Sequence, residues 1–283
     1  MSLRSAATIS FIGLTCKAFL NSGLCKISVN GLQYLTQELD NPHRSHDRGI
    51  LTISNHISTL DDPVTWGILP MKYYLRSSRF TRWTLGASDI MFTNPLFSTF
   101  FRYGQVLETF RGKGIYQPAV ENAIEKLNQG CWARSILLNL ARFVHLFGEG
   151  KVNQPGTYRK DENGFAILPR FKWGVGRILS STDHPPIVIP MWITGFDKLM
   201  PEGRAFPFKY FPRIGARLSV TFGKPLPFDQ LRSIQNRVAS ERKPEQTQIE
   251  FDARIRTEIT NTVYQEILDL GRRVSGASLE SPH

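Results

Sequence analysis

Short apolar runs alternate along the chain with stretches whose apolar residues recur every three or four positions. Runs typical of buried strands occupy residues 50–54, 144–147 and 186–193, while residues 216–222 alternate between apolar and polar positions. A further strand is expected at residues 104–108. Because helical patterns lie between several of these strands, we expect a mixed sheet flanked by helices, in the α/β class.

Start and stop signals mark the expected helices. One helix is predicted with Asp62 as its N-cap and Pro63 in its first helical position. Another should run from Pro118 to Gly130, and a long amphipathic helix should end before Gly271. The apolar face of this last helix has residues four positions apart: Phe251, Ile255, Ile259, Val263 and Ile267.

The domain organisation follows from the lack of an internal linker. The chain has 283 residues, which is ample for a substantial core. No composition shift divides the alternating region, so we expect a single domain at residues 40–272. Residues 1–39 are expected to form an N-terminal targeting or membrane-associated segment, and residues 273–283 a C-terminal tail.

Composition and charge narrow the choice of partners. Hydrophobic residues make up 41% and charged residues 21%, which excludes a disordered chain and a fibrous repeat. The 35 Lys and Arg exceed the 24 Asp and Glu by 11, which gives a formal net charge of +11. Aromatic residues make up 11% of the chain. This combination indicates a polyanionic partner, either nucleic acid or an anionic membrane, unless the basic charge has no functional meaning.

The cysteines and the other side chains suggest no metal or cofactor. Cys16, Cys25 and Cys131 are odd in number and show no Cys-x-x-Cys spacing. A disulfide framework or a thiolate metal site is therefore not expected. No cluster of metal ligands is visible in the sequence, so we predict no metal and no cofactor.

The N-terminal region has a membrane-like composition. Residues 5–25 carry a single charge, Lys17, and residues 1–37 contain no acidic residue. No run of 18 uncharged apolar residues occurs, so a standard spanning helix is not supported. The segment fits a signal or mitochondrial targeting region, an interfacial amphipathic helix, or an ordinary packed helix.

A second candidate for membrane contact lies at residues 204–213. Prolines exclude a regular helix there, so the segment should be a loop that presents aromatic rings together with Lys and Arg. The alternative is a loop whose rings fold back into the core. The predicted membrane-contact residues are the aromatic ones: Phe206, Phe208, Tyr210 and Phe211.

The candidate catalytic pair is His56 and Asp61. On one helix, side chains five positions apart would point about 140° away from each other. Here the strand ends at Asn55 and the helix begins near Asp62, so His56 should lie in the connection, where the Asp61 carboxylate can orient the imidazole and stabilise its charged form. The alternative is that an aspartate only caps the helix and that His56 is a polar loop residue.

Glycines beside charged residues form further candidate site elements. Gly148 and Gly150 flank Glu149 after a predicted strand, and glycines allow a ligand to approach the backbone closely. Cations lie beside glycines in two other blocks, a chemistry suited to phosphate. The candidate phosphate-binding residues in these blocks are Arg111, Arg170 and Lys172. Each block alone could be a solvated turn.

The order of these motifs carries a specific resemblance. NHxxxxD, RGxGxYQ, FxEGKVN, RFKWGxGR and a P-x-x-x-P strand follow one another from residue 50 onwards. This order resembles the glycerolipid acyltransferase family of the HX4D type. The resemblance implies an α/β acyltransferase fold with interfacial membrane segments, His56 as general base and Asp61 as its partner. It also implies substrate binding by residues of the other motifs: Asn55, Arg111, Gly148, Glu149, Gly150, Arg170 and Lys172.

Within that family the motifs are most similar to a branch that works without coenzyme A. This branch implies exchange of acyl chains between phospholipids and lysophospholipids, with cardiolipin as substrate. It implies a peripheral position on mitochondrial inner and outer membranes, on the leaflets that face the intermembrane space. The alternatives are an acyl-coenzyme A-dependent acyltransferase for lysophospholipid or glycerol phosphate, and a non-catalytic peripheral membrane protein. Nucleic-acid binding would explain the charge but not the motifs, so no nucleic-acid partner is expected.

Two positions depart from the family pattern. The family usually has proline where this chain has Gly148, and glycine fixes the turn before Glu149 less firmly. In addition, the pattern passes almost directly from Trp132 into the next strand, whereas here residues 133–143 intervene.

Overall fold

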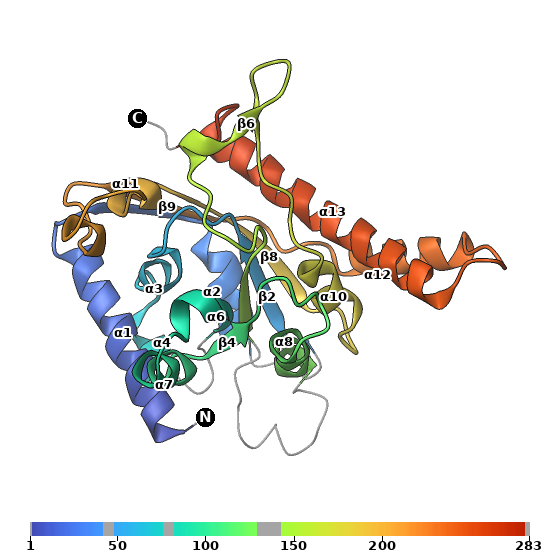
Figure 1. Ribbon diagram of the computed structural model, residues 1–283, viewed down its shortest axis with the longest axis horizontal. Coiled ribbons are helices and arrows are strands. Elements are labelled where there is room, and N and C mark those ends of the chain that lie inside the picture. Colours follow the sequence, from blue (N-terminus) through green and yellow to red (C-terminus); the bar gives the residue numbers. More distant parts are fainter. Residues whose placement is uncertain (1, 42–47, 76–81, 129–142, 281–283) are drawn as a thin grey trace.

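The computed structural model describes residues 2–41, 48–75, 82–128 and 143–280 (Figure 1). In this part of the chain, seven strands form one sheet in the order β1-β9-β8-β2-β5-β3-β4. The strands of this sheet are β1 (Lys26–Asn30), β2 (Ile50–Ser54), β3 (Trp83–Ala87), β4 (Val106–Thr109), β5 (Phe143–Phe147), β8 (Ile187–Thr194) and β9 (Arg217–Phe222). A small hairpin consists of β6 (Arg159–Lys160) and β7 (Ala166–Ile167).

Helices connect most of the strands. The helices before β5 are α1 (Leu3–Asn21), α2 (Leu32–Asp40), α3 (Asp61–Trp66), α4 (Met71–Leu75), α6 (Ser88–Met91), α7 (Pro95–Tyr103) and α8 (Pro118–Asn128). The later ones are α10 (Gly174–Ser180), α11 (Phe196–Leu199), α12 (Phe228–Ser240) and α13 (Gln248–Ser275), with 3-10 turns η1 (Pro155–Thr157) and η2 (Phe208–Tyr210).

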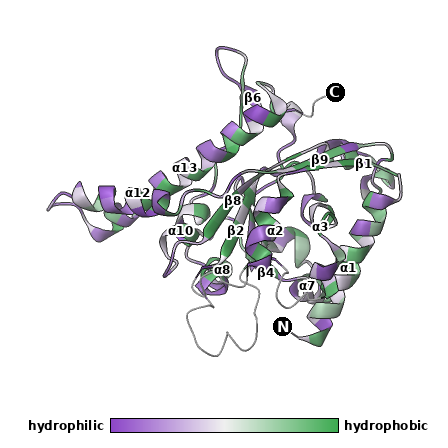
Figure 2. Ribbon diagram, turned by 180° about the vertical axis from the view of Figure 1, so that it is seen from behind, coloured by the Kyte–Doolittle hydropathy of each residue, from purple (hydrophilic) through white to green (hydrophobic). Residues whose placement is uncertain are grey.

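The sheet is mixed in direction. β8, β2, β5, β3 and β4 run parallel to one another, whereas β9 is antiparallel to β8 and β1 pairs in parallel with β9. The prediction of an α/β fold with a mixed sheet flanked by helices is therefore confirmed. Parallel strands are buried on both faces, which explains why β2 and β8 are fully buried and mostly apolar (Figure 2).

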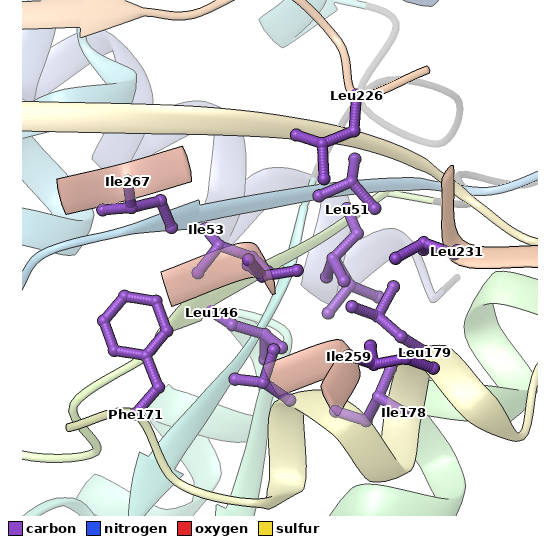
Figure 3. Close-up of a cluster of buried hydrophobic side chains, with 14 of the residues drawn as sticks. Leu51, Ile53, Leu146, Phe171, Ile178, Leu179, Leu226, Leu231, Ile259 and Ile267 are labelled. Atoms are coloured by element: carbon purple, nitrogen blue, oxygen red, sulfur yellow. The ribbon is translucent and has the colours of Figure 1, made fainter. Parts of the chain in front are cut away.

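Each face of the sheet has its own apolar core. On β2, Leu51 and Ile53 point toward α8, α10 and α13, and Ile50 points to the opposite face, toward α2 and α3. Figure 3 shows the first cluster, in which Ile259 and Ile267 of α13 pack with residues of β2 and α10. Figure 1 shows α13 on one side of the sheet and α1 and α3 on the other.

Two predicted boundaries are wrong for identifiable reasons. α3 begins at Asp61 with Leu60 as N-cap, so Asp62 lies inside the helix and Pro63 occupies its third position. α13 continues past Gly271 to Ser275 because this glycine lets the helix contact the indole of Trp192, where a Cβ would lie 2.7 Å from the ring. Gly271 therefore marks a close helix–sheet contact rather than a helix end.

Both ends of the chain pack against the domain. β1 extends the main sheet, and Leu35 and Leu39 of α2 are buried, so the predicted boundary after residue 39 falls inside the packed structure. At the other end, Leu279 is buried and the carbonyl of Ala277 accepts a hydrogen bond from Ala166. The predicted tail at residues 273–283 therefore differs from the structure over its described part.

α1 has two different faces. Its inner face is buried at Ser5, Ile9, Gly13 and Leu20, where it contacts α3, α4 and α7. Among the described residues, α1 is the helix that is long and apolar enough to cross a bilayer, with a mean hydropathy of 1.2. The packed-helix alternative accounts for the inner face, whereas the outer face exposes Phe11 and Leu14.

Candidate active site

The candidate site lies where parallel strands end. β2 and β5 are paired in register, with Ser54 beside Phe147, and each strand is followed directly by its motif. His56 comes two residues after the end of β2, and Glu149 comes two residues after the end of β5. In open α/β sheets, this carboxyl edge is where ligands usually bind.

His56 and Asp61 meet as the sequence predicted. The imidazole Nδ1 lies 2.8 Å from Oδ2 of Asp61, and the same oxygen accepts the backbone N–H groups of Ile57 at 2.6 Å and Ser58 at 2.8 Å. Burial raises the pKa of the fully buried Asp61 carboxyl, and these donors oppose that shift. With Nδ1 directed at Asp61, Nε2 is the ring nitrogen that can take a proton from a substrate.

Glu149 holds the backbone of His56. Its Oε1 accepts the backbone N–H of His56 at 3.0 Å, and its Oε2 accepts the side-chain amide of Asn153 at 2.5 Å. Only 2% of Glu149 is exposed, and burial raises the pKa of its carboxyl to about 8. Both oxygens thus have partners in the protein, which differs from the predicted contact between Glu149 and substrate.

Asn55 also makes a different contact from the predicted one. Its amide donates to the carbonyl of Ile193 and accepts the N–H of Ile193, both at 2.9 Å, and the side chain is fully buried. Both polar ends of Asn55 are therefore used to fasten the end of β2 to β8. The predicted contact of Asn55 with substrate therefore differs from the bonds that its side chain makes here.

Two aromatic rings lie behind the imidazole. Phe147 stacks on His56 with ring centroids 4.0 Å apart, and the ring of His145 meets Phe147 edge-on at 4.6 Å. His145 is buried, which lowers the pKa of its imidazole to about 3, and its Nδ1 lies 2.8 Å from the hydroxyl of Thr52. A neutral His145 therefore supports the stack without adding a charge beside His56.

A largely buried ion pair fixes the helix that follows the site. Arg82 donates through Nε to Oδ1 of Asp62 at 2.9 Å, and a second bond joins Nη2 to Oδ2. The indole N–H of Trp66 donates to the same Oδ1 at 3.1 Å. Asp62 therefore ties α3 to the start of β3 instead of capping the helix.

The glycines beside Glu149 lie against the RFKWG motif. A Cβ on Gly148 would lie 2.5 Å from the ring of Phe171, so this ring occupies the space that a larger residue would need. Gly150 has φ +70°, and a Cβ there would lie 2.9 Å from Cγ of Lys172. The backbone N–H of Lys172 donates to the carbonyl of Gly148 at 2.8 Å. The structure thus brings Gly148, Gly150 and Lys172 together beside His56.

The other two predicted phosphate ligands, Arg170 and Arg111, have solvent-exposed side chains. Arg170 is exposed next to the buried Phe171. Arg111 follows β4 at the same edge of the sheet and pairs with Asp89 at 2.9 Å, both side chains being about half exposed. β4 is three strands from β2, or about 14 Å at the usual strand spacing, so Arg111 can reach a remote part of a large substrate but not the imidazole.

The predicted membrane loop keeps its aromatic residues at the surface. Phe206, Phe208 and Phe211 are 76%, 65% and 60% exposed. The alternative in which these rings fold back into the core is wrong for these three residues. The inserted stretch at residues 133–143 lies outside the described residues, apart from Phe143, which begins β5.

Sequence reasoning missed Phe147, Asn153, His145 and Arg82. His145 appeared only as a member of a strand, and Phe147 and Asn153 only as the first and last letters of the FxEGKVN motif. Their roles depend on which strands are neighbours, which the pattern along one strand does not give. Among the described residues, no three His, Cys, Asp or Glu side chains gather as metal ligands.

Known proteins share this arrangement of motifs. A family model described as Acyltransferase matches residues 26–194, which include β2, β5 and the His56–Asp61 pair. The chain belongs to the acyltransferase family, and it is an enzyme that transfers acyl groups on glycerophospholipids. Within the family, the similarity supports the tafazzins.

Three relatives illustrate this similarity. A protein named taffazin from Dictyostelium discoideum is 34% identical over 233 residues, covering 81% of this chain and 72% of its own. Tafazzin from Drosophila melanogaster is 38% identical over 177 residues, 62% of this chain and 40% of its own. An N-acylphosphatidylethanolamine synthase from Arabidopsis thaliana is 35% identical over 197 residues, 68% of this chain and 61% of its own. The alignments with the last two relatives cover less than two thirds of those proteins.

Proposed function

We propose that this protein is a phospholipid–lysophospholipid transacylase that works without coenzyme A. The main support is the His56–Asp61 pair, in which a carboxylate with three hydrogen-bond donors orients an imidazole at the carboxyl edge of the sheet. The similarity to the tafazzins supports this activity over other members of the family.

The reaction needs a general base and no covalent intermediate. Neutral His56 takes the proton from the free hydroxyl of a lysophospholipid, and this oxygen attacks the ester carbonyl of a donor phospholipid. The tetrahedral intermediate then breaks the old ester bond, and the imidazolium returns its proton to the departing glycerol oxygen. One ester is thus exchanged for another, while Asp61 stabilises the imidazolium between the two proton transfers.

Cations around the pair would hold the lipids. Lys172 packs beside Gly150, where it would bind a phosphate of the substrate and stabilise developing negative charge, and the exposed Arg170 would add to the positive charge nearby. Arg111 would bind a second phosphate at the other end of the edge. A lipid with phosphates at two separated points suits this layout, and cardiolipin is such a lipid. Gly148 and Gly150 would instead let Phe171 and Lys172 pack closely against the turn that carries Glu149.

We further propose that the protein lies on mitochondrial membranes, on the leaflets facing the intermembrane space. This placement rests on the resemblance to the tafazzins and on the formal charge of +11, which favours an anionic surface. Cardiolipin-containing membrane would then be both the substrate and the partner.

The membrane-facing surface would combine α1, α7 and the loop at residues 206–214. These three segments contain no acidic residue. The outer face of α1 exposes apolar side chains, and α7 has no buried residue although it contains one Leu and three Phe. The exposed apolar residues are Leu3, Phe11, Leu14, Leu96, Phe97, Phe100, Phe206, Phe208, Phe211 and Ile214. α1 touches α7 through a bond from Ser5 to the carbonyl of Tyr103, and the carbonyl of Leu24, just after α1, accepts from Gly215.

Vesicle flotation with and without cardiolipin tests this surface. Replacing Leu96, Phe97 and Phe100 by Ser should weaken flotation, as should replacing Phe206, Phe208, Tyr210 and Phe211 by Ser. The control is a Phe165→Ser, Ile167→Ser variant, because these residues on the β6–β7 hairpin are 41% and 44% exposed. Flotation that stays unchanged in both test variants would exclude this surface as the membrane contact.

A transfer assay tests the activity itself. Radiolabelled acyl chains in a donor phospholipid should appear in an added lysophospholipid when no coenzyme A or acyl-coenzyme A is present. Transfer that requires acyl-coenzyme A would instead identify the acyl-coenzyme A-dependent alternative. Acylation of the amine of phosphatidylethanolamine would point to the activity named in the Arabidopsis relative. Vesicle binding without any transfer would identify a non-catalytic membrane protein.

A further inference from the structure

A closed ring of hydrogen bonds surrounds the backbone of His56. The N–H of His56 donates to Oε1 of Glu149 at 3.0 Å, and Oε2 of Glu149 accepts the side-chain amide of Asn153 at 2.5 Å. The backbone N–H of Asn153 then donates to the carbonyl of His56 at 2.7 Å. Both backbone polar groups of His56 are therefore held by one pair of residues.

This ring follows from the parallel pairing of β2 and β5. Ser54 and Phe147 are register partners, so His56 and Glu149 leave the sheet side by side, each two residues beyond its paired strand. Past the strands, the sheet ladder no longer supplies partners for the backbone. At His56, the Glu149–Asn153 pair supplies the hydrogen-bond partners that a neighbouring strand would otherwise supply.

The residues on either side of His56 are also hydrogen-bonded to distant segments. Asn55 is bonded to Ile193, and the carbonyl of Ile57 accepts from the amide of Gln154 at 3.4 Å. His56 differs from them because it is held at both its N–H and its carbonyl by the segment after β5. Fixing both groups limits the backbone rotation of His56 and so aims Nδ1 at Asp61.

We infer that Asn153 is a positioning residue for the general base, acting with Glu149 through the backbone of His56. The inference rests on the proposed function, since it assigns the pair to the same transfer reaction. Neither residue needs to touch the substrate in this role. The alternative, in which Glu149 binds the substrate glycerol, would require a buried carboxylate to give up both of its present partners.

Exchanging the two functional groups tests the inference. Asn153→Asp replaces the amide that donates to Glu149 with a second carboxyl group. Assayed at a pH above about 8, where Glu149 is also ionised, the two carboxylates repel each other and the ring should break. Glu149→Gln combined with Asn153→Asp rebuilds the bond in reverse, because the amide introduced at position 149 can then donate to the carboxylate introduced at position 153. We expect Asn153→Asp to lower kcat about 100-fold with KM changed less than about threefold, because a displaced base slows the reaction without weakening binding. The double variant should recover most of the loss.

A matched control and a second readout keep the outcomes distinct. Asn122→Asp makes the same change on the exposed side of α8 and should leave kcat unchanged. Hydrogen exchange at the His56 amide, followed by mass spectrometry of the peptide spanning residues 55–60, should speed up in Asn153→Asp and slow again in the double variant. This exchange readout needs no activity, so it still tests the ring if the unmutated protein transfers no acyl chains.

Two results would overturn the inference. The first is an Asn153→Asp variant that keeps the kcat and the amide exchange of the unmutated protein. The second is a loss of activity that appears only in KM and is not recovered in the double variant, which would assign Glu149 and Asn153 to substrate binding instead.

Discussion

The ring of Phe147 stacks on the imidazole of His56, with centroids 4.0 Å apart and planes 16° from parallel. In the proposed mechanism the imidazole becomes an imidazolium, and an aromatic face stabilises a cation that lies over it. Phe147 would therefore act at the stage of the proposed reaction when His56 is charged, besides limiting rotation of the ring.

Phe147→Leu should lower kcat about tenfold, which corresponds to the loss of an aromatic pair of about 1.4 kcal/mol. Phe147→Tyr keeps the ring face and serves as the control. A kcat in Phe147→Leu equal to that of the unmutated enzyme would contradict this role.

His56→Ala should reduce acyl transfer by roughly 100-fold to 10,000-fold, the usual contribution of a general base. Asp61→Asn should have a similar effect, since an amide cannot stabilise the imidazolium and would disturb the backbone donors from Ile57 and Ser58. Vesicle flotation should be unchanged in His56→Ala. Transfer at the normal rate in His56→Ala would remove this residue from the mechanism.

Glu149 should make stability depend on pH. Burial raises the pKa of its carboxyl from 4.5 to about 8, so the folded state keeps a proton that the unfolded state releases above 4.5. Its contribution to stability is therefore fully present below pH 4.5 and falls as the pH rises toward about 8, by about 1.4 kcal/mol per pH unit.

Denaturant unfolding of the unmutated protein and Glu149→Gln between pH 6.5 and 8 measures this effect. Above pH 6.5 the buried His145 no longer contributes a slope, since its pKa is lowered to about 3 from 6.5. The difference in the free energy of unfolding should shift in favour of Glu149→Gln as the pH rises. Parallel pH curves would show that the Glu149 carboxyl keeps its ordinary pKa.

Arg82→Met should destabilise the fold by about 3 kcal/mol, because it leaves the largely buried Asp62 carboxylate without its charge partner. Arg237→Met, which breaks the more exposed pair with Glu258, should cost less than about 1 kcal/mol. Thermal unfolding of both variants gives the comparison. Equal losses in the two variants would mean that the Arg82–Asp62 pair behaves as a surface pair.

The sequence alone predicted the features that depend on local pattern. The strands at residues 50–54 and 186–193 were found because a strand buried on both faces must be apolar. The meeting of His56 and Asp61 was predicted because His56 lies in the connection between the end of a strand and the start of a helix. These inferences need only the residues of one segment.

Features that depend on contacts between distant segments were not predicted. Glu149 and Asn55 have the chemistry expected of substrate-binding residues. Only the pairing of β2 with β5 and β8 shows that their polar atoms are bonded within the protein. Gly271 resembles a helix stop, and only its contact with Trp192 shows why the helix continues. The local sequence pattern shows what chemistry a side chain offers. Which residue that side chain contacts depends on the order of the strands in the sheet.

The pairing of β1 with β9 has a consequence for synthesis of the chain on the ribosome. Lys26 of β1 pairs with Arg217 of β9, so β1 finds its strand partner in the described sheet only after β9 has been synthesised. During that interval, the apolar α1 and the strand after it are available to a membrane or a chaperone. Among the described helices, the one best suited to a bilayer thus leaves the ribosome before the sheet can be completed.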